Sequence, residues 1–267
     1  NQYLKEHAEN LPDKCVVTAL HQTAGKGRLG KQWHDREGKS LLASWLYKNL
    51  TVEQMTLLPF LSGISVRQAL EEMGFTSIFL KWPNDVVAFK DGEFFKIAGI
   101  LCESRIMAEQ TFGICGIGIN LMQTKEEFEQ QGLLYAGSLK SIWGREASKD
   151  QLLKNLSICL GDNLERLKQN PQEILTRYSA CCITLGREVK IESGNESFLA
   201  KAVSVSSQGE LICQTVNFFI PLDHFIGALF HQFLTTIISR CQQIIVQQRN
   251  AANISNFTTC IIVDVVD

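Results

Sequence analysis

The chain has 267 residues, of which 45% are hydrophobic and 20% are charged. This composition excludes collagen-like and intrinsically disordered chains and predicts one large hydrophobic core, with room for a second, smaller domain. The 26 basic and 28 acidic residues give a formal net charge of -2, so no global basic field recruits nucleic acid or anionic membranes.

Apolar runs and helix-start signals alternate through the first two thirds of the chain. The runs predict buried strands at residues 15–20, 41–47, 79–82, 97–103 and 111–119. Capping signals predict a helix from Thr51 to Gly74, in which Pro59 should cause a kink or a later start. Two further helices are expected, from Ser148 to about residue 167 and from Pro171 onward.

The alternation of buried strands and helices ends after residue 182. Three short strands with glycine-containing turns are expected between residues 186 and 216, and they are typical of a small β-barrel of roughly 45 residues. An amphipathic helix is predicted over 225–245, where apolar residues recur every fourth position. The last eight residues, CIIVDVVD, are predicted to form a strand.

The cysteine pattern and the absence of long apolar runs bear on the cellular compartment. The nine cysteines include no CxxC pair, and we find neither a secretory signal nor an apolar run of about 20 residues. We therefore expect a cytoplasmic protein with free thiols and without a membrane partner.

A glycine-rich, basic loop follows the first predicted strand. Residues 25–33, GKGRLGKQW, combine three glycines with Lys26, Arg28 and Lys31. Glycines let backbone N–H groups approach an anion, and cations offset its charge. The loop predicts a phosphate or carboxylate site, with an ordinary exposed loop as the other interpretation. A Walker A loop is excluded because Lys26 is not followed by Ser or Thr, and a poor helix start after the loop disfavours dinucleotide binding.

Polar residues follow the strand predicted over 79–82. The segment LKWPND, residues 80–85, ends in a rigid proline turn that carries Asn84 and Asp85. Carboxylate and amide oxygens suit Mg²⁺ and the phosphates it binds. The segment predicts a Mg²⁺ or nucleotide site, and a simple turn is the alternative.

Two further apolar strands carry a polar residue at one end. Lys96 begins KIAGIL, where its cation could offset the negative charge that builds up in phosphate or carboxylate chemistry, unless it is merely solvated. Asn120 ends GIGIN, whose small residues suit either a ligand lying across the backbone or a tight turn. No HExxH motif and no His spaced for a Ser or Cys nucleophile points to zinc or covalent catalysis.

In this order, GKGRLG, KWPND, KIAGIL and GIGIN resemble the bacterial biotin protein ligases, over residues 1 to about 227. In that family a GRGRxG loop, a KWPND turn, a KxAGIL strand and a GxGxN strand end form one site. The resemblance implies an ATP-dependent ligase that uses Mg²⁺ to activate biotin as biotinyl-5'-AMP. Biotin would then pass to a specific lysine of the biotin carboxyl carrier protein of acetyl-CoA carboxylase.

The resemblance also implies the site residues. The expected catalytic cations are Lys96 and Arg28. The expected biotin site comprises Gln22, Gly25, Lys26, Arg28, Lys96, Gly99 and Gly116. The expected ATP site comprises Lys26, Arg28, Lys31, Trp33, Asn84, Lys96 and Asn120. Metal ligands are expected at Asn84 and Asp85.

The implied fold is α+β, of the class II synthetase and biotin–lipoate ligase type, with a central mixed sheet flanked by helices and a small SH3-like barrel. We expect the catalytic domain over 1–183, the barrel over 184–229 and an extension of unknown role over 230–267. The resemblance is to the monofunctional type without a DNA-binding domain, so no DNA partner is expected. The carrier would dock by strand pairing at a sheet edge, and homodimerisation through that edge is left open.

The chain departs from the family pattern at four places. Lys26 stands where the family usually has arginine, and only Asn1 remains of the family's Ser-Thr-Asn biotin motif. The segment before Lys96, residues 89–95, is longer than the family pattern predicts. The chain also continues beyond residue 229, where the family usually ends. Two alternatives stay open: a lipoate or octanoate protein ligase of the same fold, and a non-catalytic biotin-binding module. A nicotinamide enzyme is a more distant third.

Overall fold

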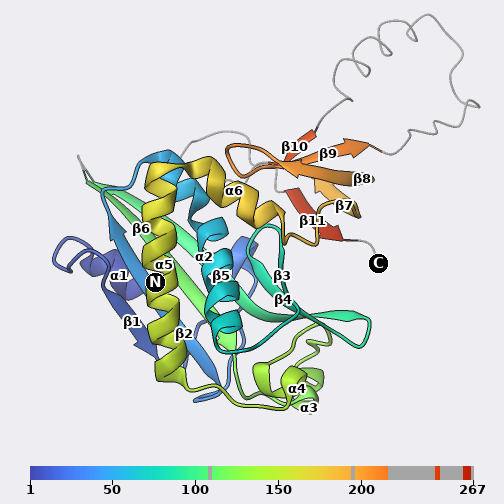
Figure 1. Cartoon of the computed structure of the whole chain (residues 1–267), viewed down its shortest axis with the longest axis horizontal. Helices are drawn as coiled ribbons and strands as arrows, with labels where there is room; N and C mark the ends of the chain where they lie inside the picture. Colours follow the sequence, from blue (N-terminus) through green and yellow to red (C-terminus); the bar gives the residue numbers. More distant parts are fainter. Residues whose placement is uncertain (108–109, 194–195, 216–243, 247–260, 266–267) are drawn as a thin grey trace, which may run out of the picture. The chain divides into compact units, whose positions relative to one another are not determined.

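The computed structural model describes residues 1–107, 110–193, 196–215, 244–246 and 261–265. It divides into two compact units, of which the first holds residues 1–182 and the second begins at Ile183 (Figure 1).

Within the described residues, the first unit contains a β-sheet with helices packed on it. Its strands are β1 (Val16–Ala19), β2 (Ser40–Lys48), β3 (Ile78–Lys81), β4 (Asp85–Lys90), β5 (Glu93–Met107) and β6 (Gln110–Asn120). Its helices are α1 (Gln2–His7), the 3-10 turn η1 (Arg28–Gly30), α2 (Val52–Glu72), α3 (Lys125–Gln130), α4 (Leu139–Trp143), α5 (Lys149–Gln169) and α6 (Pro171–Ser179). The five strands and three helices predicted for this part are confirmed, whereas β4, α1, α3 and α4 were not predicted. No helix of the described part is long and apolar enough to cross a membrane.

The sheet of the first unit has the order β1-β2-β6-β5-β4-β3, and each pairing of its strands is antiparallel. The expectation of a mixed sheet is therefore wrong. The physical reason lies in the few residues that separate β3 from β4, β4 from β5 and β5 from β6. Connections of this length can join only antiparallel neighbours, because a parallel pair needs a crossover of a dozen or more residues.

The two faces of this sheet are covered by different helices. On one side, α2 packs against β3, β4, β5 and β6, and α5 and α6 lie beside it (Figure 1). On the other side, α1 packs in a small core made by Leu4, Ala8, Leu46, Phe112 and Ile114. Side chains alternate between faces along a strand, so Gly116 and Gly118 lie on the same face as Ile114. The candidate site is on this α1 face.

A complete capping box begins α2. Thr51 Oγ1 accepts from the Gln54 backbone N–H at 3.2 Å, and Gln54 Oε1 accepts from the Thr51 N–H at 3.0 Å. The later start expected at Pro59 is wrong, since α2 begins at Val52 and includes the proline. An interior proline costs about 3 kcal/mol of helix stability. Here it lies in a buried stretch whose packing outweighs that cost.

Removing the cap should destabilise the first unit without touching the site. We expect Thr51→Ala to lower the free energy of unfolding by about 1 kcal/mol, measured by urea denaturation, because the Gln54 backbone N–H loses its acceptor. Thr56→Ala is the matched control, since Thr56 lies on the same helix and only bonds back to the Val52 carbonyl. Equal losses in the two variants would contradict a specific role for the cap.

The second unit contains, in its described residues, an antiparallel sheet of order β10-β9-β8-β7-β11. Its strands are β7 (Glu188–Ser193), β8 (Glu196–Val205), β9 (Leu211–Thr215), β10 (Ile244–Val246) and β11 (Ile261–Val265). The three strands predicted over 186–216 and the C-terminal strand are confirmed. The helix predicted over 225–245 lies outside the described residues, except at its end, where β-branched residues form β10 instead. The SH3-like barrel and the domain limits stay predictions.

Candidate active site

An ion pair joins two of the predicted site residues. Lys96 on β5 places its Nζ 2.7 Å from Oδ1 of Asp85, the first residue of β4, and the two side chains are 27% and 24% exposed. The Lys96 backbone is also held, because its N–H donates to the Tyr135 carbonyl at 2.7 Å and its carbonyl accepts from the Gly137 N–H at 2.9 Å. The result is a half-buried cation on fixed backbone, which can meet an anionic substrate.

The glycine-rich loop folds back on itself as a short hairpin. The Trp33 N–H donates to the Gly25 carbonyl at 3.1 Å, and the Gly27 N–H donates to the Lys31 carbonyl at 2.7 Å. These two bonds bring the ends of residues 25–33 together, with η1 at the tip. The loop is therefore an ordered feature rather than an open surface loop.

The three cations of this loop lie in different environments. Arg28 is half-buried, whereas Lys26 and Lys31 are exposed. Burial lowers the pKa of the Arg28 guanidinium from its ordinary value, and the nearby Asp85 carboxylate opposes that shift. An arginine stays protonated despite such a shift. Arg28 thus adds a second charged group near the Lys96–Asp85 pair.

The indole of Trp33 lies against two glycines of the sheet. Gly99 and Gly118 pair opposite each other on β5 and β6. A Cβ at Gly99 would be 2.8 Å from Trp33 Cζ3, and one at Gly118 would be 2.7 Å from Trp33 Cε2. Lys96 Nζ is 6.0 Å from the indole ring centroid. Only glycine at both positions lets the ring approach the sheet this closely.

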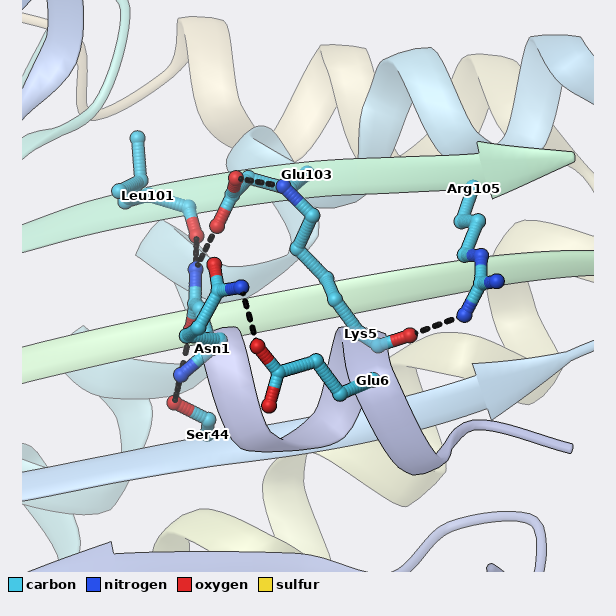
Figure 2. A network of polar contacts seen from close by, with 8 residues as sticks. Asn1, Lys5, Glu6, Ser44, Leu101, Glu103 and Arg105 are labelled. Carbon is cyan, nitrogen blue, oxygen red and sulfur yellow. Dashed lines mark hydrogen bonds and ion pairs between the residues drawn. The ribbon is translucent and has the colours of Figure 1, made fainter. Parts of the chain in front are cut away.

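A third glycine, Gly116, faces the side chain of Asn1. A Cβ on Gly116 would be 2.3 Å from Asn1 Oδ1. The amide nitrogen of Asn1 donates to the Leu101 carbonyl at 3.0 Å and to Glu103 Oε2 at 2.8 Å, while Ser44 Oγ donates to Asn1 Oδ1 at 2.7 Å (Figure 2). We call Gly99, Gly116 and Gly118 the glycine floor. Trp33 covers one part of this floor and Asn1 the other.

An unpartnered donor adds to the case for a ligand at the glycine floor. The indole nitrogen of Trp33 is buried and, within the part of the chain that the structure describes, has no hydrogen-bond partner. Buried polar groups normally have one. An acceptor on a bound molecule could satisfy this N–H, so the residues present fit a ligand that carries a hydrogen-bond acceptor.

Two other predicted site residues are held mainly through backbone groups. The Gln22 N–H donates to Asp35 Oδ1 at 3.4 Å, and the Asn84 side-chain nitrogen donates to the Ile100 carbonyl at 2.7 Å. The Asn84 bond leaves the amide oxygen of that side chain as the atom that can meet a ligand.

Asn120 lies deeper than the resemblance implies. It is 4% exposed, its amide nitrogen donates to the Gly137 carbonyl at 3.0 Å, and its amide oxygen accepts from Gln123 Nε2 at 3.2 Å. These contacts tie the end of β6 to the segment that also holds Lys96. The Asn120 side chain therefore stabilises the local fold through these hydrogen bonds, while its direct contact with a nucleotide stays a prediction.

The donor set near Asp85 fits a metal ion that arrives with phosphates. Across the described ranges, no group of three or more His, Cys, Asp and Glu side chains gathers as a metal site. Mg²⁺ is commonly held by one or two carboxylates together with substrate phosphates and waters. Asp85 and the amide oxygen of Asn84 meet that need, and they do not make an all-protein cage.

Three residues of the site were not predicted: Ser44, Glu103 and Gly118. Asn1 was named only as what remains of the family's biotin motif, with no contact assigned to it. Gly118 could have been found, because it is two residues from Gly116 and so points to the same face of the strand. Ser44 and Glu103 come from β2 and β5. No local pattern in the sequence brings those elements together.

The chain is similar in sequence to proteins of known function. The model of the Biotin/lipoate A/B protein ligase family matches residues 1–120. The biotin–[acetyl-CoA-carboxylase] ligase of Mycobacterium tuberculosis is 30% identical over 207 residues, which cover 74% of this chain and 73% of that protein. The bifunctional ligase/repressor BirA of Bacillus subtilis is 26% identical over 209 residues, and the match covers 77% of this chain but only 63% of that relative.

A solved structure is similar over most of its length. The biotin protein ligase from Aquifex aeolicus in complex with biotin and ATP has a TM-score of 0.66 and 30% sequence identity, covering 80% of this chain and 87% of that chain. Sequence and fold point to the same family. The chain therefore belongs to the biotin protein ligase family.

Proposed function

We propose that this chain is an ATP-dependent biotin protein ligase, which activates biotin as biotinyl-5'-AMP and transfers it to a lysine of the biotin carboxyl carrier protein of acetyl-CoA carboxylase. The observation that carries the proposal is the Lys96–Asp85 pair beside the glycine floor. Two anions, the biotin carboxylate and a phosphate of ATP, must be brought together. Cations held on fixed backbone serve that purpose.

In the first step, a carboxylate oxygen of biotin bonds to the α-phosphorus of ATP. The bond from this phosphorus to the oxygen that bridges to the β-phosphate breaks, and pyrophosphate leaves. Lys96 and Arg28 offset the negative charge that develops on the phosphorus oxygens. Asp85 orients the Lys96 ammonium, and Asp85 and Asn84 would hold Mg²⁺, which neutralises phosphate charge when bound.

In the second step, the neutral amine of the carrier lysine attacks the acyl carbonyl of biotinyl-AMP. The bond from this carbonyl carbon to the phosphate oxygen breaks, AMP leaves with the electron pair, and the amine loses a proton to solvent. Carrier docking by strand pairing would use an edge of the sheet, which β1 and β3 form.

The proposal is tested by incubating the purified chain with biotin, [α-³²P]ATP and Mg²⁺, with and without a carrier domain. We expect labelled biotinyl-AMP in both cases, and biotinylated carrier only when the carrier is present. Adenylate made from lipoate in preference to biotin would instead assign a lipoate ligase. Biotin binding without any adenylate would assign a non-catalytic binding module.

The exposed Lys26 should limit how long the adenylate is retained. Lysine keeps the charge of the family's arginine but lacks its bidentate fork. We expect Lys26→Arg to slow the release of biotinyl-AMP by about 3- to 10-fold, measured by filter binding of the labelled intermediate. Lys14→Arg is the control, because Lys14 pairs with Glu165 instead. Equal release rates from wild type and Lys26→Arg would contradict the prediction.

A further inference from the structure

Glu103 on β5 is shared between one residue of α1 and the N-terminal cap of that helix. Its Oε1 accepts from Lys5 Nζ at 2.8 Å, and its Oε2 accepts from the amide nitrogen of Asn1 at 2.8 Å (Figure 2). Burial raises the pKa of Glu103, but the hydrogen bonds from Lys5 and Asn1 outweigh burial and leave the pKa below its ordinary value. The carboxylate is therefore ionised at neutral pH and acts only as an acceptor.

Both hydrogens and the oxygen of the Asn1 side-chain amide are hydrogen-bonded. Its nitrogen has two hydrogens, of which one reaches the Leu101 carbonyl and the other reaches Glu103. Its oxygen accepts from Ser44 Oγ. Three partners on two strands thus hold the amide against Gly116, where no Cβ separates it from the sheet. Glu103 is the only charged partner of the three, so its bond is the strongest constraint.

The same strand holds α1 at a second point. The Arg105 guanidinium donates to the Lys5 carbonyl, two residues along β5 from Glu103 on the same face (Figure 2). The docking of α1 therefore has a support that does not depend on Glu103. Loss of the Glu103 carboxylate should free the Asn1 side chain more than it frees the helix.

We infer that Glu103 is a positioning residue for biotin, which holds Asn1 over Gly116 and so fixes one wall of the biotin pocket. This inference rests on the proposed function, and it goes further because Glu103 need not touch the substrate. The Lys5–Glu103 ion pair is partly exposed, at 34% and 27%, and such pairs contribute little by themselves. The hydrogen bond from Asn1 to the half-buried Glu103 carboxylate is therefore the contact that should affect biotin binding.

The test compares Glu103→Ala with Lys5→Met by calorimetric titration with biotin. Glu103→Ala should weaken biotin binding by about 10-fold, because Asn1 loses its charged anchor. Lys5→Met removes the same ion pair but keeps the Asn1 bond, so its affinity should stay within about 2-fold of wild type. The KM for ATP should change by less than about 2-fold in both variants, so the loss in Glu103→Ala is expected for biotin alone.

A double-mutant cycle separates positioning from general stability. If Glu103 acts through Asn1, Asn1→Ala combined with Glu103→Ala should bind biotin no more weakly than Asn1→Ala alone. Should Glu103→Ala fail to fold, Glu103→Gln takes its place in the cycle, with a smaller loss expected because one acceptor atom remains.

Three results would overturn the inference: wild-type affinity in both Glu103 variants, an equal loss in Lys5→Met, or additive losses in the double mutant. A wild-type chain that binds biotin and forms adenylate, with Glu103 variants that bind biotin as tightly as wild type, overturns this inference alone. A wild-type chain that neither binds biotin nor forms adenylate overturns the proposed function as well.

Discussion

Replacement of Lys96 by alanine is expected to lower the rate of biotinyl-AMP formation by about 1,000-fold, the scale seen when a preorganised group that stabilises transition-state charge is removed. Both backbone groups of Lys96, its N–H and its carbonyl, are hydrogen-bonded, and its Nζ lies 2.7 Å from Asp85 Oδ1. Without it, the Asp85 carboxylate would face the incoming phosphates unpaired. The measurement is a single-turnover assay with labelled ATP.

The Lys96 prediction has a control and a complementary variant. Lys140→Ala removes an exposed lysine that pairs with Glu146 on the surface, and it should keep the wild-type rate. Lys96→Arg keeps the charge but changes its shape, so an intermediate rate is expected. If Lys96→Ala formed adenylate within about 10-fold of wild type, the charge would have to come from another residue, and the site would have to be reassigned.

Replacement of Gly116 by alanine is expected to weaken biotin binding by about 100-fold, because a misplacement of about 1 Å in a site can cost this much. The new Cβ would be 2.3 Å from Asn1 Oδ1, so the Asn1 side chain has to move. Gly116 lies opposite Ser44 on β2 and Leu101 on β5. Both of these residues are hydrogen-bonded to the Asn1 side-chain amide. The wall over the glycine floor would therefore be displaced as a whole.

Fold stability and biotin affinity should separate in this variant. Gly116 does not have a positive φ, so alanine suits its backbone conformation. Gly161→Ala is the matched control, since Gly161 lies on α5 and a Cβ there meets no atom within 4 Å. It should keep its affinity for biotin and gain up to about 1 kcal/mol of helix stability. Equal affinities of the two variants, measured by calorimetry, would argue against a close wall at Gly116.

The local elements of the fold were predictable, because their signals lie within a few residues. The capping box of Thr51 and Gln54 placed α2 correctly. The strand β4 was missed although Asp91-Gly92, a strong two-residue hairpin signal, follows it and both residues have positive φ. Asp85 was assigned to the KWPND turn and residues 89–95 to a longer segment before Lys96, and this division hid the strand.

The order of the strands and the assembly of the site were less predictable. The sheet order depends on the pairing of β2 with β6, in which Ser40 lies opposite Asn120, and no local pattern encodes such a distant partner. Lys96 and Asp85 were each found as candidates, yet their proximity was implied only by family resemblance. The Asn1–Glu103 contact joins residues 102 positions apart, so it could be found only in the folded chain.

The pairing of β2 with β6 also has a consequence for the chain during its synthesis. Eight of the nine residues of β2 are buried in the folded protein, yet its partner β6 is made more than 60 residues later, as their bounds show. During that interval β2 is an apolar strand with a free edge, the kind of segment that associates with other chains. We therefore expect the strand that supplies Ser44 to the site to be the one that chaperones must shield on the ribosome.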